Sequence, residues 1–327
     1  MPPYPSRPTV AVLGECVADA FTITSPRPRT ETPPTGLDLR VLPGGGPANT
    51  AVSLARLGTP TRFFARLSHD LFGDLFRARL THSGVDLSAC VPAREPSTLA
   101  VAAIDEMGQA TYSFFADGAA DWQWTDAELS AVPLDGISCL HTGSLAFARE
   151  PGGPRLEEHL ARARPHMTVS LDPNVRPLLV EPVAYRKRLH RWCELADILR
   201  LSEDDLTHLL PGTTPEEACD TLHIAGAPLV VITLGSRGAL ASLGGTRAYI
   251  PARPTDVVDT VGAGDSFTAG LLHHLNTLGR LGGRLDELTI DETIDACAYA
   301  AEVAARTCAV PGANPPWAHQ LPSTPRP

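Results

Sequence analysis

Residues 259–265 read Asp-Thr-Val-Gly-Ala-Gly-Asp, and this short stretch carries more chemical information than any other part of the chain. Its two glycines flank Ala263, so the backbone can turn tightly and present several N–H groups toward one point. Residues 266–272 have the apolar spacing of a helix, which places those N–H groups at a helix N-terminus, where anions bind. Asp265 then lies at the edge of the anion site and can accept a proton from an attacking hydroxyl group. The stretch therefore predicts a site of phosphoryl transfer.

A glycine-rich turn capped by an aspartate is the structural alternative for the same residues. Two preceding features favour phosphoryl transfer: a β-type run at Val257 and Val258, and a second acid, Asp259, followed by a hydroxyl residue.

The composition excludes several other classes of protein. At 327 residues with 43% hydrophobic content, the chain can bury a sizeable core as one large α/β domain or two smaller ones. A formal net charge of −10 without a basic run argues against a nucleic-acid or anionic-membrane surface. The seven cysteines never form a CxxC pair, so neither a zinc ribbon nor a disulfide framework is indicated. Residues 1–8 lack an apolar signal segment and no run of eighteen apolar residues occurs, so a cytoplasmic protein is expected.

Short β-type runs alternate with longer helical patterns along the chain. The predicted strands are 9–13, 61–65, 138–141, 167–171, 198–201 and 229–233, and the predicted helices are 49–57, 71–83, 155–164, 185–196, 215–225, 266–275 and 293–306. Such alternation predicts a mostly parallel sheet with helices on both faces, whose ligands bind outside the carboxyl ends of the strands. Polar or glycine residues follow the predicted strands at that edge, namely Gly14, Gly143, Asp172, Ser202 and Gly235.

Two segments depart from this alternation. Residues 21–41 are rich in Thr and Pro and end in an alternating pattern, and residues 97–104 and 109–115 read as a hairpin around a turn at 105–108. Together they predict a small β-sheet flap. We find neither a repeat nor a linker, so residues 1–327 are expected to form a single domain with a Pro-rich, loosely held tail from Pro315.

The stretch at 259–265 resembles the DTxGAGD signature of the ribokinase-like (PfkB) family of carbohydrate kinases. Residues 42–58 resemble that family's other signature, GG…N.A……LG, and lie over two hundred residues earlier, in the order the family shows. The resemblance implies a ribokinase-like fold, a lid formed by about 20–42 and 97–116 that covers the sugar, and ATP-dependent phosphorylation of a sugar. A lid is useful because phosphoryl transfer must exclude water.

The resemblance also implies roles for individual residues. Asp265 would be the general base, and Gly262, Ala263 and Gly264 would form the anion hole. The sugar would be held by Asp19, Gly45, Gly46, Asn49 and Arg176. Each of these has a structural alternative: Asp19 as a surface acid, Gly45 and Gly46 as a plain turn, Asn49 as a helix N-cap, and Arg176 as the salt-bridge partner of Asp172.

The nucleotide site and its ions follow in the same way. ATP would contact the strand-turn residues Thr233, Gly235 and Gly238 together with Gly262 and Gly264. Ser202 and Asp205 stand where the family has Asn and Glu, so the Mg²⁺-organising role of that element does not transfer directly; Mg²⁺ itself is required to neutralise the phosphates. A K⁺ site would use Asp259, the carbonyl group of Val261 and the loop 310–312, but Pro316 replaces the family's usual serine. Three basic residues near strand ends, Arg176, Arg200 and Arg237, are not assigned as a clamp.

The acceptor is indicated by the segment Asp172-Pro-Asn-Val-Arg176, which resembles the version in fructokinases and 2-keto-3-deoxygluconate kinases. Residues 112–118 and 141–146 also resemble bacterial fructokinase sequence. The predicted activity is transfer to a primary hydroxyl of a hexose, most similar to fructokinase. Alternatives are a 2-keto-3-deoxygluconate or other ketose kinase, a nucleoside kinase, and a sugar- or nucleotide-sensing binding protein, for which an intact Asp265 would have no use. Exposed lid strands favour a homodimer through the lid.

Overall fold

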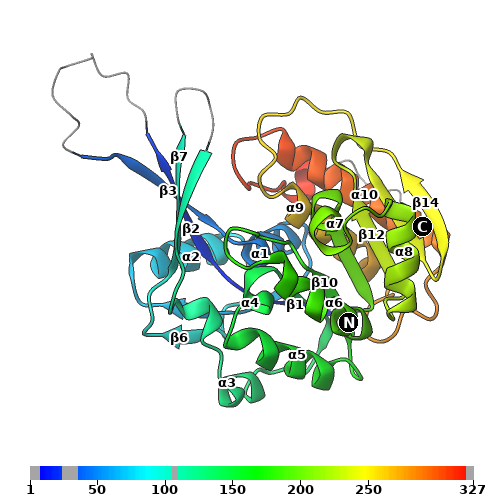
Figure 1. Cartoon of the computed structure of the whole chain (residues 1–327), viewed down its shortest axis with the longest axis horizontal. Coiled ribbons are helices and arrows are strands. Elements are labelled where there is room, and N and C mark those ends of the chain that lie inside the picture. The colour runs from blue at the N-terminus through cyan, green and yellow to red at the C-terminus, as the bar shows by residue number, and fades with distance from the viewer. Residues whose placement is uncertain (1–7, 24–35, 105–109, 322–327) are drawn as a thin grey trace, which may run out of the picture.

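Eight strands form the central sheet of the computed structural model, which describes residues 8–23, 36–104 and 110–321 (Figure 1). The strand order is β14-β13-β12-β11-β10-β9-β1-β4, and the strands are β1 (Thr9–Leu13), β4 (Thr61–Phe64), β9 (Ile137–Gly143), β10 (Thr168–Asp172), β11 (Ile198–Ser202), β12 (Leu229–Thr233), β13 (Ala239–Leu243) and β14 (Thr246–Ile250). All pairs are parallel except β12–β13 and β13–β14. The predicted, mostly parallel sheet is confirmed, and the carboxyl ends of its parallel strands share one edge.

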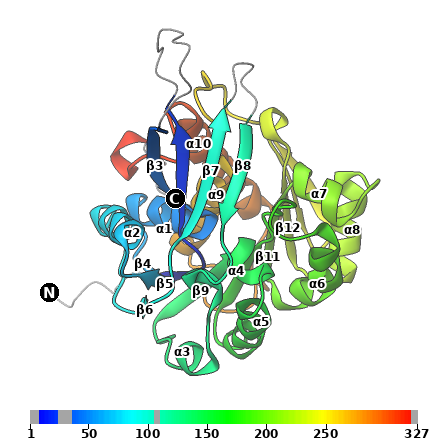
Figure 2. The same ribbon diagram turned by 60° about the vertical axis from the view of Figure 1, so that its left-hand side comes forward.

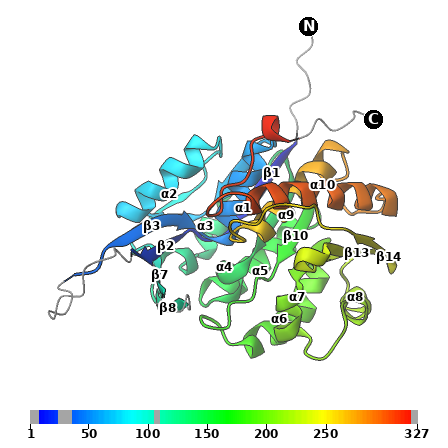
Figure 3. The same cartoon turned by 90° about the horizontal axis from the view of Figure 1, so that it is seen from above.

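Helices cover both faces of this sheet, as the view from above shows (Figure 3). One face carries α1 (Gly46–Arg56), α2 (Leu71–His82), α9 (Ala263–Thr277) and α10 (Ile290–Cys308), and the other carries α4 (Ser144–Ala148), α5 (Gly152–Ala163), α6 (Pro182–Leu195), α7 (Glu203–Leu209) and α8 (Pro215–Ile224). Because successive strand residues point to opposite faces, Val10 and Val12 of β1 pack in the apolar cluster with α1, α9 and α10, whereas Ala11 and Leu13 pack in the opposite cluster. A sheet buried on both faces follows.

Side-chain caps fix where several helices begin. The Asp70 carboxylate accepts the N–H of Gly73 at 2.8 Å, and Thr289 forms a reciprocal capping box with Glu292. Such caps contribute about 1 kcal/mol each. The cap at Thr289 explains why α10 begins at Ile290, three residues before the predicted start at Thr293.

A second, four-stranded sheet projects from the carboxyl edge of the first (Figures 1 and 2). Its order is β3 (Leu39–Gly44), β2 (Val17–Thr22), β7 (Thr98–Ile104) and β8 (Ala110–Phe115). This confirms the predicted small sheet, which begins at Val17 rather than at residue 21. The predicted turn at 105–108 and residues 24–35 of the predicted lid lie outside the described residues. The described residues also contain the strands β5 (Arg66–Ser68) and β6 (Val91–Ala93), the helix α3 (Asp126–Ser130) and three short 3-10 helices (Ala120–Trp122, Gly235–Arg237 and Ala318–Gln320).

Two sequence-based expectations are wrong. Val257 and Val258 do not form a strand; the two residues are 63% and 58% exposed in an irregular segment. Two β-branched residues alone therefore did not indicate a core strand. The tail is not loosely held up to residue 321, because Pro315 is buried and the Arg56 guanidinium lies over the Trp317 ring, 5.0 Å from its centroid. Within the described ranges, no helix combines the length and apolar character needed to cross a membrane.

Candidate active site

The turn at 262–264 begins α9 at the carboxyl edge of the sheet. Gly262 is left-handed, with φ of 78°, and a Cβ added there would lie 2.6 Å from the Cβ atom of Ala313, so glycine is required at this position. The Ala263 N–H donates to the Thr260 carbonyl at 3.2 Å. The N–H groups of Gly264 and Asp265 have no backbone acceptor in the described part of the chain, as expected for a first helical turn. These two amides are therefore available to an anion.

Asp265 joins α9 to α1. Its Oδ2 atom accepts a hydrogen bond from Asn49 Nδ2 at 2.9 Å, and its carbonyl oxygen accepts one from Thr50 Oγ1 at 3.4 Å. The pKa of Asp265 is raised to about 7, mainly by burial. The hydrogen bond from Asn49 lowers this pKa, and the charge of the nearby Asp172 carboxylate raises it. A carboxylate with this pKa can take up a proton near neutral pH.

The other carboxylate oxygen of Asp265 faces Gly46. A Cβ at Gly46 would lie 3.3 Å from Asp265 Oδ1, 2.9 Å from Asn174 Nδ2 and 3.8 Å from Ser144 Oγ. Ser144 and Asn174 have φ values of 53° and 43°, and Asn174 Nδ2 donates to Ser144 Oγ at 3.3 Å. Positive φ in a residue other than glycine stores about 1–3 kcal/mol of strain and often marks a functional site. Three polar groups thus converge above Gly46.

Sequence reasoning did not assign Ser144 and Asn174 to the site. Asn174 lies inside the Asp172–Arg176 segment that resembles fructokinase sequence, so the sequence did contain a signal that pointed to it. Ser144 follows directly on β9, and Glu15 fixes its turn by accepting the N–H of Ala146 at 3.0 Å.

The other residues predicted to hold the sugar lie around the base of the small sheet. Asp19 is half-buried on β2, so close to Gly44 that a Cβ there would lie 2.0 Å from Asp19 Oδ2. Gly45 has φ of 99°, and a Cβ there would meet the Glu15 carbonyl oxygen at 2.6 Å. Burial raises the pKa of Asp19 to about 6, and the Arg176 charge opposes that rise. Glycine is therefore needed beside Asp19 for steric reasons, not only as a turn residue.

Two structural alternatives are excluded. Arg176 does not pair with Asp172: its Nη1 atom donates to the Val175 carbonyl at 3.1 Å, and Asp172 pairs with Arg200 at 2.8 Å. Asn49 is not an N-cap, because α1 already begins at Gly46. The positive charge of Arg176 opposes the rise in the pKa of both Asp19 and Asp265, so Arg176 lies close enough to act on both carboxylates.

A pocket of about 570 Å³ lies on the other side of the α9 turn. Its polar end is formed by the end of β12 and the following loop, and its apolar wall by α10; the lining includes Thr233, Gly235, Ser236, Gly238, Gly264, Phe267, Ala301, Ala304, Ala305 and Cys308. The predicted nucleotide residues Thr233, Gly235, Gly238 and Gly264 thus share one pocket, while Gly262 is not part of its lining. A pocket of this size with apolar walls and a few polar groups is typical of small-molecule sites.

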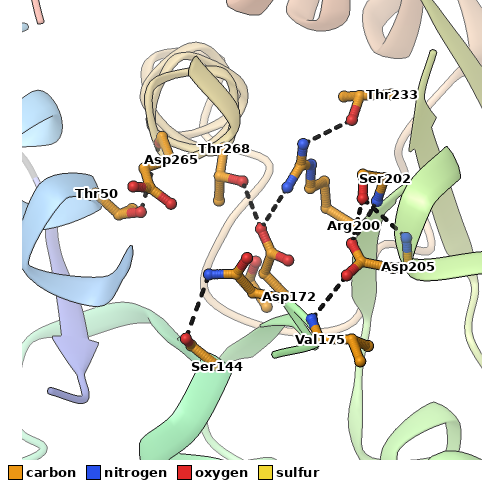
Figure 4. A network of polar contacts seen from close by, with 12 residues as sticks. Thr50, Ser144, Asp172, Val175, Arg200, Ser202, Asp205, Thr233, Asp265 and Thr268 are labelled. Carbon is orange, nitrogen blue, oxygen red and sulfur yellow. Dashed lines mark hydrogen bonds and ion pairs between the residues drawn. The ribbon is translucent and has the colours of Figure 1, made fainter. Parts of the chain in front are cut away.

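A network of polar contacts lies between the polar groups around Gly46 and the 570 Å³ pocket (Figure 4). Arg200 Nη1 donates to Asp172 Oδ2 at 2.8 Å, and Arg200 Nη2 donates to Thr233 Oγ1 at 2.6 Å. Asp205 has a local role: its Oδ2 accepts the Ser202 N–H at 2.7 Å, and its Oδ1 accepts the Val175 N–H at 2.7 Å. Asp205 therefore caps α7 and fixes the segment after β10.

Asp259 connects the two loops predicted to surround a cation. Its Oδ1 atom accepts the Val261 N–H at 3.0 Å, and its Oδ2 atom accepts the Gly312 N–H at 2.8 Å. Across residues 8–23, 36–104 and 110–321, no group of three or more His, Cys, Asp or Glu side chains could hold a metal ion. The K⁺ site remains a prediction.

The central sheet, the small sheet and the α9 turn beside a pocket of about 570 Å³ define a phosphotransferase of the ribokinase-like class. The family model of the pfkB family carbohydrate kinases matches residues 7–320, and this chain belongs to that family. The chain is 38% identical over 234 residues to a fructokinase of Rhizobium leguminosarum bv. trifolii, covering 71% of each, and 34% identical over 267 residues to a fructokinase of Klebsiella pneumoniae, covering 80% of this chain and 86% of that one. The predicted family is confirmed, and so is the predicted similarity of this chain to bacterial fructokinases.

Solved structures show the same relationship. A fructokinase of Vibrio cholerae O395, with fructose, ADP and a calcium ion bound, superposes with a TM-score of 0.77 at 26% identity, covering 94% of this chain and 95% of that one. The ribokinase-like fold is confirmed.

Proposed function

We propose that this protein is an ATP-dependent fructokinase that transfers the γ-phosphoryl group to a primary hydroxyl of fructose. The observation that carries the proposal is the position of Asp265: its Oδ1 atom faces the polar groups above Gly46, and Gly264, one residue before it, lines the 570 Å³ pocket. Asp265, a proton acceptor, therefore lies between the polar groups that would bind the sugar and the pocket that would bind the nucleotide. The curated fructokinase relatives support fructose as the acceptor.

The sugar would be held by Asp19, Gly45, Gly46, Asn49 and Arg176. We add Ser144 and Asn174 to this set, because their polar groups lie beside Asp265 Oδ1 at Gly46. Carboxylate, amide and guanidinium groups bind hydroxyls in complementary ways, since carboxylates only accept and guanidinium only donates. The small sheet, with its base at Asp19, would act as the lid that keeps water out.

In the proposed step, the primary hydroxyl gives its proton to Asp265 Oδ1 while its oxygen attacks the γ-phosphorus. The bond from that phosphorus to the bridging oxygen of ADP breaks. The turn Gly262–Gly264 stabilises the negative charge of the transferring group, with the N–H groups of Gly264 and Asp265 as the freer donors.

Mg²⁺, when bound with ATP, neutralises the charge of the bridging phosphates. Because hard cations in kinases are held largely by phosphate oxygens and water, the lack of an acidic trio in the described residues fits this arrangement. Asp259 and the Val261 carbonyl would hold K⁺, since each Asp259 oxygen accepts only one described N–H and retains a further lone pair. Dimerisation through the small sheet and a cytoplasmic location remain predictions.

The raised pKa of Asp265 predicts how turnover depends on pH. The deprotonated carboxylate is the active base, so kcat should fall about tenfold per pH unit below a pKa of about 7 and level off above it. The measurement is kcat at saturating fructose and ATP between pH 5.5 and 8.5. A kcat that stays constant across this range would separate Asp265 from the proton transfer.

A 2-keto-3-deoxygluconate kinase is the second candidate, and Arg176 is the observation that favours it. That acceptor carries a carboxylate, which an exposed guanidinium could bind in a bidentate manner. An ATP-consumption assay with fructose, 2-keto-3-deoxygluconate, ribose and adenosine separates the kinase candidates. A sensing protein would consume ATP with none of them.

A further inference from the structure

Arg200 is a buried cation in the middle of a central strand, β11 (Ile198–Ser202). Only 6% of its surface is exposed. Two of its donors have partners from the neighbouring strands: Asp172 on β10 accepts from Nη1, and Thr233 on β12 accepts from Nη2 (Figure 4). Its Nε atom is buried without a partner among the described residues. An arginine with five N–H donors thus uses few of them within the protein.

The guanidinium lies against the first turn of α9. A Cβ added at Gly264 would lie 2.9 Å from both Arg200 Nη1 and Arg200 Nη2. Arg200 and Gly264 also both line the 570 Å³ pocket. The positive charge of Arg200 therefore lies at the polar end of this pocket, next to the two amides that lack a backbone acceptor.

The surrounding charges keep Arg200 ionised. Burial opposes the charge, but the carboxylates of Asp172, Asp205 and Asp265 outweigh burial and raise its pKa. Asp172 Oδ2 also lies 3.5 Å from Thr268 Oγ1, which fixes the acceptor from the α9 side. A residue that served only to join β10 to β11 would not need a charge, because apolar residues of similar size usually stabilise a core at least as well as a buried ion pair.

We propose that Arg200 contacts the terminal phosphoryl group of the bound nucleotide, and that Asp172 and Thr233 hold its guanidinium in position. A planar fork of donors suits phosphate oxygens, and a cation fixed before the reaction stabilises the charge of the transferring group. The inference rests on the proposed function in one respect, that the nucleotide is a triphosphate. It also gives Asp172 a positioning role.

The test is nucleotide binding without sugar, measured by calorimetry with ADP and with a non-hydrolysable ATP analogue. Arg200→Met should weaken binding of the analogue by about 10- to 100-fold and leave ADP within about threefold, because the lost hydrogen bonds go to the terminal phosphoryl group. It should also lower kcat with fructose by about 10²- to 10³-fold. Arg200→Lys should recover part of the affinity for the analogue, since the charge remains while the fork is lost.

Arg237→Met is the matched control. It removes an arginine from the loop after β12, but that side chain is 61% exposed, pairs with Glu203 and does not line the pocket. Both nucleotides should bind it as they bind the wild-type protein. If Arg200→Met fails to fold, the double variant Asp172→Asn/Arg200→Met removes both buried charges and should show the same selective loss.

Equal binding of the analogue by wild-type protein and a folded Arg200 variant would overturn the inference, and so would an equal loss for ADP and the analogue. Because binding is measured without sugar, the result does not depend on which acceptor the enzyme uses. A wild-type protein that binds the analogue but does not phosphorylate fructose would contradict only the proposed function.

Discussion

Asp265→Asn is expected to lower kcat with fructose by about 10²- to 10⁴-fold while ATP still binds. The substitution keeps the size of the side chain and one oxygen acceptor, so the contact with Asn49 Nδ2 can persist. It removes the group that takes the proton of the attacking hydroxyl. Steady-state kcat and calorimetric binding of the ATP analogue measure the two effects separately. A kcat near that of the wild type would remove Asp265 from the mechanism.

The same variant should be more stable than the wild type at alkaline pH. Because burial raises the pKa of Asp265 from 3.8 to about 7, its contribution to stability is fully present below pH 3.8 and is lost as pH rises through 7. Asparagine does not ionise, so Tm of Asp265→Asn should exceed that of the wild type at pH 8 and not at low pH. Asp74→Asn is the control: Asp74 lies in the first turn of α2 as Asp265 lies in that of α9, but its side chain is 74% exposed.

Gly264→Val should lower kcat by about 10³-fold or more. Its Cβ would lie 2.9 Å from the Arg200 guanidinium, so either the turn or Arg200 must move. A displacement of about 1 Å at a catalytic group is enough to cost about 10²-fold, and loss of charge stabilisation adds to it.

Gly283→Val is the control for this change. Gly283 has ordinary φ, and a Cβ there would have no neighbour within 4 Å, so kcat should stay within about twofold of the wild type. Unchanged turnover in a folded Gly264→Val protein would mean that the turn does not face the transferring phosphoryl group.

Local patterns in the sequence predicted much of the fold. The strands at 9–13 and 229–233 have the predicted bounds, because short apolar runs between turn residues leave little freedom. The β13–β14 hairpin was missed although its signal was present: Gly244 and Gly245 both have positive φ, as a two-residue hairpin turn requires. The strand predicted at Val257 and Val258 was wrong because β-propensity reflects packing on a half-buried sheet surface, whereas both residues are exposed.

The candidate site could be proposed from the sequence where a motif is continuous, but not where contacts join residues on distant strands. Asp265 and its glycines lie in one stretch, so their chemistry could be proposed from the order of residues alone. The hydrogen bond from Asn49 to Asp265 joins residues 216 apart, and Arg200 meets its partners only because β10, β11 and β12 are neighbours in the sheet. The pattern of a single sequence does not show which strands are neighbours in the sheet.

The most direct test of the central claim is a side-by-side comparison of kcat/KM for fructose, 2-keto-3-deoxygluconate, ribose and adenosine at saturating ATP and Mg²⁺. We expect fructose to exceed each of the others by about 10²-fold or more, because polar groups of the site that lose their hydroxyl partners penalise the wrong acceptor. A higher kcat/KM for any of the other three acceptors would contradict the fructokinase assignment.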